Sequence, residues 1–163
     1  MKRISLRIRN ALPILAALLA LSIGGCSYST SFVVVNKSSQ LIEVRYRVKP
    51  TGHEPPVFAA RPAKIAASEI ATRDQRAWRN LTSDEFQIDQ ETRTVTVNVM
   101  PEEALWVTNM FHYFGDEDPI DVREWPIAEI TLTGIEGTMT FTGDKSRQAF
   151  QYESRVLYTL TYK

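Results

Sequence analysis

The 163-residue sequence predicts an all-β fold, an antiparallel β-sandwich of immunoglobulin-like type with about seven or eight strands. Short segments in which apolar and polar residues alternate recur along the chain, and clusters of turn-forming residues separate them. No segment between them has the length and periodicity of a crossover helix, which argues against a parallel α/β sheet. A small closed β-barrel is the alternative arrangement of the same strands.

The first predicted strands lie on either side of a polar turn. Residues 32–35 form an apolar run rich in valine, and residues 36–40 carry turn-forming side chains. Over residues 42–48 apolar residues alternate with charged ones, which is typical of a strand with one buried face. We therefore predict a hairpin formed by these two strands.

Prolines set apart the stretch that follows. Four of them lie between residues 50 and 62, and proline cannot donate a hydrogen bond to a central strand. We predict a loop here, with short edge segments at 57–60 and 64–70. Residues 71–81 are predicted to form a short helix, because the apolar residues there recur at helical spacing.

The remaining strands follow one another regularly and fill the rest of the domain. They are predicted at residues 86–88, 95–99, 104–114, 127–133, 138–142 and 156–162. Turns are expected between them, including a Gly134–Gly137 turn and a Gly143–Asp144 turn.

The N-terminus has the pattern of a secretory leader. The first ten residues carry four basic side chains and no acidic one, and an apolar segment follows from Ala11 to Ile23. This segment has roughly 13 residues, well below the ~20 needed to cross a bilayer as a helix. The run ends in Ile23-Gly24-Gly25-Cys26, with small residues directly before the only cysteine of the chain.

This ending resembles the lipobox of bacterial lipoproteins. The resemblance implies that residues 1–25 form a signal peptide cleaved between Gly25 and Cys26, and that Cys26 carries a diacylglyceryl group and a further acyl chain such as palmitate. Residues 26–31 are then a lipidated N-terminus with a short tether, and residues 32–163 a single sandwich domain. The alternatives are an ordinary signal peptide with a chance cysteine, or an uncleaved anchor.

The residue after the cysteine suggests the destination. Ser27 is not the aspartate that retains lipoproteins at the inner membrane of enteric bacteria. The resemblance therefore implies a protein of the cell envelope that is lipid-anchored at the periplasmic face of the outer membrane. Two or more acyl chains would make this attachment lasting.

The charge and the cysteine count exclude several classes of function. The leader holds four of the 19 basic residues and none of the 19 acidic ones, so the mature chain has a net charge of −4. Such a domain has no electrostatic basis for binding nucleic acid. With Cys26 lipidated, no thiol remains for a disulfide, a cysteine-ligated metal or a nucleophile.

No motif in the chain indicates catalysis or a cofactor. The only histidines, His53 and His112, have no local nucleophile or orienting carboxylate in a known arrangement. The acidic run 115–121 offers oxygen ligands for calcium, but its contiguous order and Pro119 do not match a calcium loop, and a solvated turn is expected. We predict no catalytic residue, no metal site and no cofactor.

The most unusual composition is an aromatic-rich segment late in the chain. Its members are Trp106, Phe111, His112, Tyr113, Phe114 and Trp125. They suit either a core strand with a covering loop or a surface that binds a partner. The expected function is a non-enzymatic, lipid-anchored binding or structural module facing the periplasm, with an envelope protein or a glycan as partner. The alternatives are an inhibitor or immunity lipoprotein for an envelope enzyme, or an unrecognised hydrolase.

Overall fold

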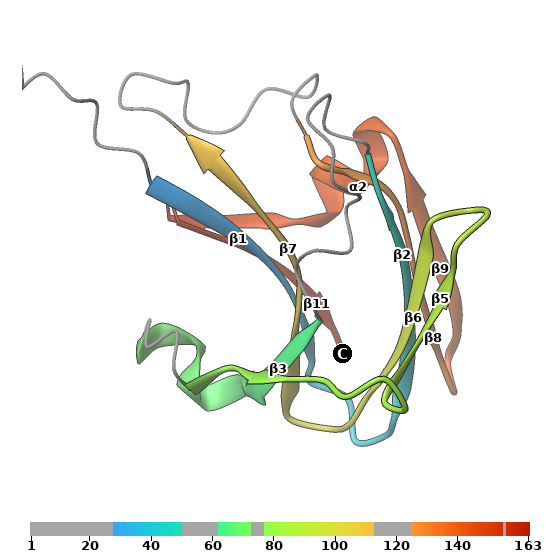
Figure 1. Ribbon diagram of the computed structural model, residues 1–163. Coiled ribbons are helices and arrows are strands. Elements are labelled where there is room, and N and C mark those ends of the chain that lie inside the picture. Colours follow the sequence, from blue (N-terminus) through green and yellow to red (C-terminus); the bar gives the residue numbers. More distant parts are fainter. Residues whose placement is uncertain (1–27, 50–61, 73–76, 113–124, 155) are drawn as a thin grey trace, which may run out of the picture.

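The computed structural model of the chain describes residues 28–49, 62–72, 77–112, 125–154 and 156–163. These residues form two open sheets that face one another, so the predicted all-β sandwich is confirmed and a closed barrel is not formed (Figure 1). The strand order is β10-β11-β1-β7-β3-β4 in the six-stranded sheet and β5-β6-β2-β8-β9 in the five-stranded sheet. We call them the first and the second sheet.

The strands and helices have the following bounds. The strands are β1 (Tyr28–Asn36), β2 (Ile42–Val48), β3 (Ala63–Ala66), β4 (Arg79–Asn80), β5 (Phe86–Asp89), β6 (Thr94–Val99), β7 (Glu103–His112), β8 (Ile127–Gly134), β9 (Gly137–Thr142), β10 (Gln151–Ser154) and β11 (Leu157–Tyr162). A 3₁₀ helix, η2 (Ala67–Thr72), follows β3, and a short helix, α2 (Asp144–Ala149), follows β9. The described part thus has more strands than the sequence predicts, because several pairings involve only two to four residues, as in β3, β4 and β10.

The likeness to an immunoglobulin domain extends to the sandwich architecture but not to the strand order. In a constant-type immunoglobulin domain the first strand lies at the edge of its sheet. Here β1 lies inside the first sheet, antiparallel to β7 and parallel to β11. All neighbouring strands of the second sheet are antiparallel.

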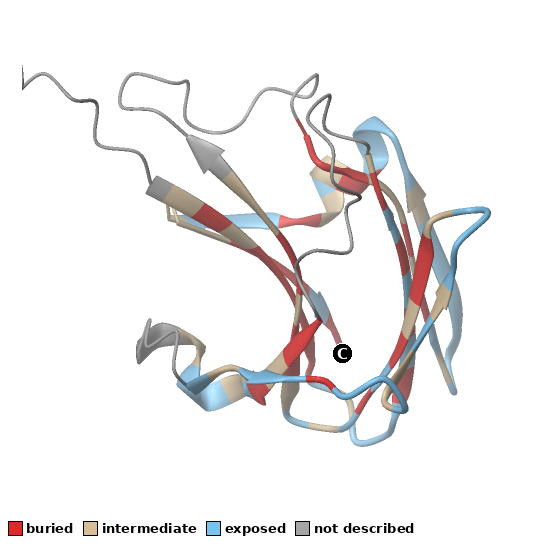
Figure 2. Ribbon diagram, in the orientation of Figure 1, coloured by how far each residue is buried: buried red, intermediate tan, exposed pale blue. Residues whose placement is uncertain are grey.

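The main core fills the space between the two sheets. In β2, Ile42, Val44, Tyr46 and Val48 point inward and are buried, while the charged residues between them are exposed. Figure 2 shows buried residues along β1, β7 and β11 of one sheet and along β2, β6 and β8 of the other, whereas β9 is mostly exposed. Each large apolar side chain buried in this way stabilises the fold by about 1.5–3 kcal/mol.

The predicted hairpin over residues 32–48 is wrong, because β1 and β2 belong to different sheets. Both faces of β1 are apolar, with Phe32 and Val34 in the main core and Val33 and Val35 in a second cluster on the outer face of the first sheet. A strand that is covered on both faces fits a central position better than a two-stranded ribbon. The polar turn after β1 carries the chain across to the opposite sheet.

The predicted helix over residues 71–81 is also wrong at its C-terminal end. Arg79 and Asn80 form β4, which pairs antiparallel with Lys64 and Ala63 of β3. The edge segment predicted at 64–70 is a strand only as far as Ala66, where η2 begins. The segment predicted at 57–60 lies outside the described residues.

The domain begins earlier than the sequence predicts. The sequence predicts a tether that includes residues 28–31, but these residues are part of β1 and pair with β7. Thr30 is 1% exposed, so the alternation of inward and outward side chains continues toward the N-terminus. The first described strand therefore starts two residues after Cys26. Within the described ranges, no helix has both the length and the apolar character needed to span a bilayer.

Candidate functional site

A groove of about 670 Å³ lies on the outer face of the first sheet. Its floor is the beginning of β1, and its walls are η2 with Trp78 on one side and β10 with the start of β11 on the other. The lining residues are Ser29, Ser31, Ala67, Ile70, Trp78, Glu153, Ser154, Val156, Leu157 and Thr159. Figure 1 shows η2 on the side of this sheet that faces away from the second sheet.

The groove exists because the outer face of β1 changes character along its length. Toward the C-terminal end, Val33 and Val35 are covered by Ile65 and by side chains of η2 and β7. Toward the N-terminal end, Ser29 and Ser31 occupy the equivalent positions and are too small to fill the same space. The groove therefore forms where the outward-facing residues of β1 change from valine to serine.

Aromatic and aliphatic side chains form the apolar wall of the groove. Trp78 packs against Trp106, with ring centroids 6.4 Å apart and an interplanar angle of 50°. Ile70 and Leu157 pack with them against the second cluster. Such a wall offers a contact surface for an apolar side chain.

The polar groups of the groove are hydroxyls and one carboxylate. The Thr159 hydroxyl donates to Glu153 Oε1 at 2.9 Å, and Asn109 Nδ2 donates to Ser29 Oγ at 3.0 Å. The main-chain N–H of Ser31 donates to the carbonyl of Val156 at 2.9 Å, which holds β11 against β1. The groove thus combines an apolar wall with hydrogen-bonding groups and the charge of Glu153, a composition suited to binding.

The structure separates the aromatic residues that the sequence grouped together. Trp125 is 1% exposed and lies in the main core, edge-on to Phe32 at 4.8 Å. Its assignment to a partner surface is therefore wrong, and the core interpretation holds for it. Trp106 lies in β7 and supports the groove wall through Trp78.

The other predicted site residues lie at the ends of the described ranges or outside them. The backbone of Phe111 and His112 ends β7, opposite Ser29 and Tyr28 of β1. Tyr113 and Phe114 lie outside the described residues, as do the lipidation and cleavage positions Cys26 and Gly25.

The candidate metal and histidine positions are also mostly beyond the description. The acidic run 115–121 and His53 lie outside it. Among the residues that are described, no three or more His, Cys, Asp or Glu side chains gather in a way that could hold a metal ion.

Sequence reasoning missed most residues of the groove. The sequence predicts a helix around Trp78 and a tether for Ser29 and Ser31, whereas both serines lie in β1. One signal in the sequence is the two-residue spacing of Ser29, Ser31, Val33 and Val35, which places all four on one face of a strand. The partners of that face, β10 and η2, come from distant parts of the chain and leave no such signal.

The groove lies close in the chain to the predicted lipidation site. Ser29 follows Cys26 by three residues, so their Cα atoms are at most about 11 Å apart. The cross-strand register also brings the end of β7 to the same end of the sandwich, because His112 lies opposite Tyr28.

Comparison of the chain with protein-family models, with curated proteins and with solved structures finds no significant match.

Proposed function

We propose that the protein is a lipid-anchored lipoprotein of the cell envelope that binds a polypeptide segment of another envelope protein in the groove on its first sheet. One observation carries the proposal: the floor of the groove belongs to a strand that begins two residues after Cys26. A lipid on Cys26 would therefore hold the groove at the membrane surface, facing the periplasm. The role is non-enzymatic, in binding or in assembly.

The lining favours a polypeptide over an anionic glycan. Trp78, Ile70 and Leu157 offer contacts to an apolar side chain, and the serine hydroxyls of the lining can pair with peptide N–H and C=O groups. Glu153 is the charged residue in the lining, and it disfavours an anionic ligand while favouring a lysine or arginine. The net charge of −4 on the mature chain acts in the same direction.

The lipid anchor is tested by changing the cysteine and its neighbour. Cys26→Ser should abolish incorporation of labelled palmitate and leave the protein unprocessed or soluble. Ser27→Ala, the matched control, should be labelled and should fractionate with the outer membrane as the parent does. Ser27→Asp should move the protein to the inner membrane if sorting follows the enteric rule. Mature Cys26→Ser protein that still fractionates with the membrane would refute the anchor.

The groove is tested by photo-cross-linking in the native envelope. A photoreactive residue in place of Ser154 or Val156 should give an adduct of one defined polypeptide. Adding Trp78→Ala should abolish that adduct, because it removes the apolar wall. The same residue in place of Asn98, which is exposed on β6 of the second sheet, is the control and should give none. An adduct that survives Trp78→Ala, or one that consists of glycan, would contradict the proposed ligand class.

A further inference from the structure

Strand β9 is an unprotected sheet edge. Edge strands usually carry charge, proline or a bulge, which prevents pairing with other chains. Three of the four edges formed by described strands fit this rule: β4 has two residues and Arg79, β5 ends in Asp89, and β10 has Glu153 with a register irregularity. By contrast, β9 has six residues, Gly-Thr-Met-Thr-Phe-Thr, without charge or proline.

The free hydrogen-bonding groups of β9 belong to its threonines. Gly137, Met139 and Phe141 lie opposite Gly134, Leu132 and Ile130 of β8, and the N–H of Gly143 continues this series by donating to Ala128 at 3.1 Å. In an antiparallel pair, alternate residues direct their N–H and C=O groups toward the partner strand. The main-chain groups of Thr138, Thr140 and Thr142 therefore point away from β8, and all three residues are exposed.

We propose that β9 pairs antiparallel with β9 of a second copy of this chain, with Thr140 on the two-fold axis. This register places Thr138 opposite Thr142 and Thr140 opposite its own counterpart, so each outward N–H meets an outward C=O. On the other face, Met139 lies opposite Phe141 of the second copy. Met139 is 41% exposed in the single chain, and the pairing covers it.

The strand is complementary to itself rather than to a charged partner. A two-fold axis brings identical residues together, so a charged residue near the axis would repel itself, and β9 has none. Cross-strand threonine pairs already join β8 to β9, in rows that end at this edge. The Thr131 and Thr140 hydroxyls are 3.0 Å apart, and the Thr138 hydroxyl donates to that of Thr133 at 3.3 Å. Self-pairing extends these rows across the axis.

The test uses the full-length chain in native membranes and a new cysteine at the axis. In the predicted register the two Cα atoms at position 140 are about 5.5 Å apart, within the range that a disulfide spans. Mild oxidation of Thr140→Cys should give a covalent dimer. Thr133→Cys is the matched control, because Thr133 is also an exposed threonine but lies on β8, one strand away from the edge; it should stay monomeric.

A second measurement does not depend on the disulfide. The parent chain extracted in mild detergent should sediment as a dimer, and Thr140→Pro, which removes the N–H at the axis, should sediment as a monomer. A monomeric parent, equal cross-linking at positions 133 and 140, or cross-linking of position 140 only to a different protein would each overturn the pairing. Oxidation of the parent chain shows whether Cys26 is free to cross-link, so failure of the lipid anchor is detected separately.

Discussion

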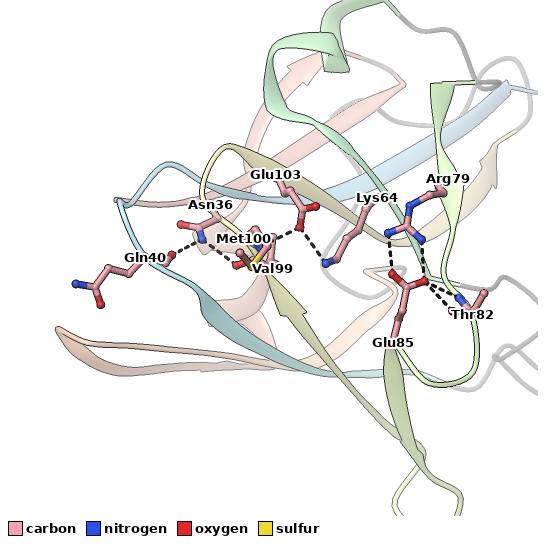
Figure 3. Close-up of polar contacts among 9 residues, drawn as sticks. All are labelled: Asn36, Gln40, Lys64, Arg79, Thr82, Glu85, Val99, Met100 and Glu103. Carbon is pink, nitrogen blue, oxygen red and sulfur yellow. Dashed lines mark hydrogen bonds and ion pairs between the residues drawn. The ribbon is translucent and has the colours of Figure 1, made fainter.

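The side-chain amide of Asn36 donates a hydrogen bond to the main-chain carbonyl of Val99 at 3.0 Å, and so joins the end of β1 in the first sheet to the end of β6 in the second (Figure 3). The same amide donates to the carbonyl of Gln40 at 2.7 Å. The main-chain carbonyl of Asn36 accepts a hydrogen bond from the N–H of Glu102 at 2.9 Å, in the turn before β7. One fully buried side chain thus contacts two connections between the sheets, the one from β1 to β2 and the one from β6 to β7.

Removing that amide should weaken the fold. Asn36→Ala leaves buried carbonyl groups without a donor, and we expect the free energy of unfolding to fall by about 1–3 kcal/mol. Asn36→Asp should cost at least as much, because a carboxylate would face two carbonyl oxygens. Urea denaturation measures the change. Ser39→Ala, an exposed change in the same turn, is the control and should shift stability by less than about 0.5 kcal/mol.

The ion pair between Arg79 and Glu85 should make stability depend on pH in acid. Arg79 contacts both carboxylate oxygens of Glu85, at 2.7 and 2.8 Å, and Thr82 donates from its N–H and its hydroxyl (Figure 3). The hydrogen bond from Arg79, followed by those from Thr82, lowers the pKa of Glu85 from 4.5 to about 2. The stabilisation is therefore present above pH 4.5 and is lost as the pH falls toward 2.

Comparison of the parent with Glu85→Gln over this range is the measurement. The difference between their urea midpoints should be largest above pH 4.5 and should shrink as the pH approaches 2. Glu91→Gln, the control, replaces an exposed carboxylate in the turn after β5 and leaves the Arg79–Glu85 pair intact, so its difference from Glu85→Gln should persist above pH 4.5. A Glu85 carboxyl that titrates near 4.5 by NMR would contradict the role given to Arg79.

Trp125 should respond to substitution as a core residue. Phe32, Phe150 and Tyr158 surround its ring, with centroids 4.8 to 5.5 Å away. Trp125→Ala should lower the free energy of unfolding by about 3–5 kcal/mol. Trp125→Phe should cost less than half as much, because the buried Nε1 of Trp125 has no hydrogen-bond partner in the described part of the chain and phenylalanine removes it. Equal losses for the two variants, measured by thermal unfolding, would contradict this packing.

Gly134 is required by the close approach of Tyr162. A Cβ atom at position 134 would lie 2.4 Å from the Tyr162 hydroxyl, and Tyr162 is a buried core residue. Gly134→Ala should therefore lower stability by about 1–3 kcal/mol through overpacking. Adding Tyr162→Phe should recover part of that loss, since the nearest clashing atom is removed. Additive losses in the double variant would show that the contact is not the cause.

The sequence located most strands because alternation along a strand is a local property. Ile42 to Val48 and Thr94 to Val99 show it directly, and both are strands of the second sheet. It did not indicate α2, in which the buried Ser146 donates to the carbonyl of Ile127 at 2.8 Å. A helix of six residues in which Ala149 is the one apolar side chain is too short to show a helical period.

The candidate site was harder to predict than the fold. Trp106 and Trp125 have similar chemistry in the sequence, yet one supports the wall of an outer groove and the other fills the core. Only the packing of other elements against them separates the two positions. The contribution of Trp78 likewise depends on where η2 and β4 bring it.

By itself, the sequence determined the class of the fold and the inward and outward faces of the long strands, and it carries the lipobox-like pattern that ends at Cys26. The tertiary structure decided which strands are neighbours, and hence that β1 and β2 lie in opposite sheets and that a groove lies beside the start of β1. The reason is physical. The alternation of apolar and polar residues is a property of one strand, whereas strand pairing depends on hydrogen bonds between distant segments. The parallel pairing of Ser31 with Leu157, from the two ends of the domain, is such a bond pattern, and it builds the floor and one wall of the groove.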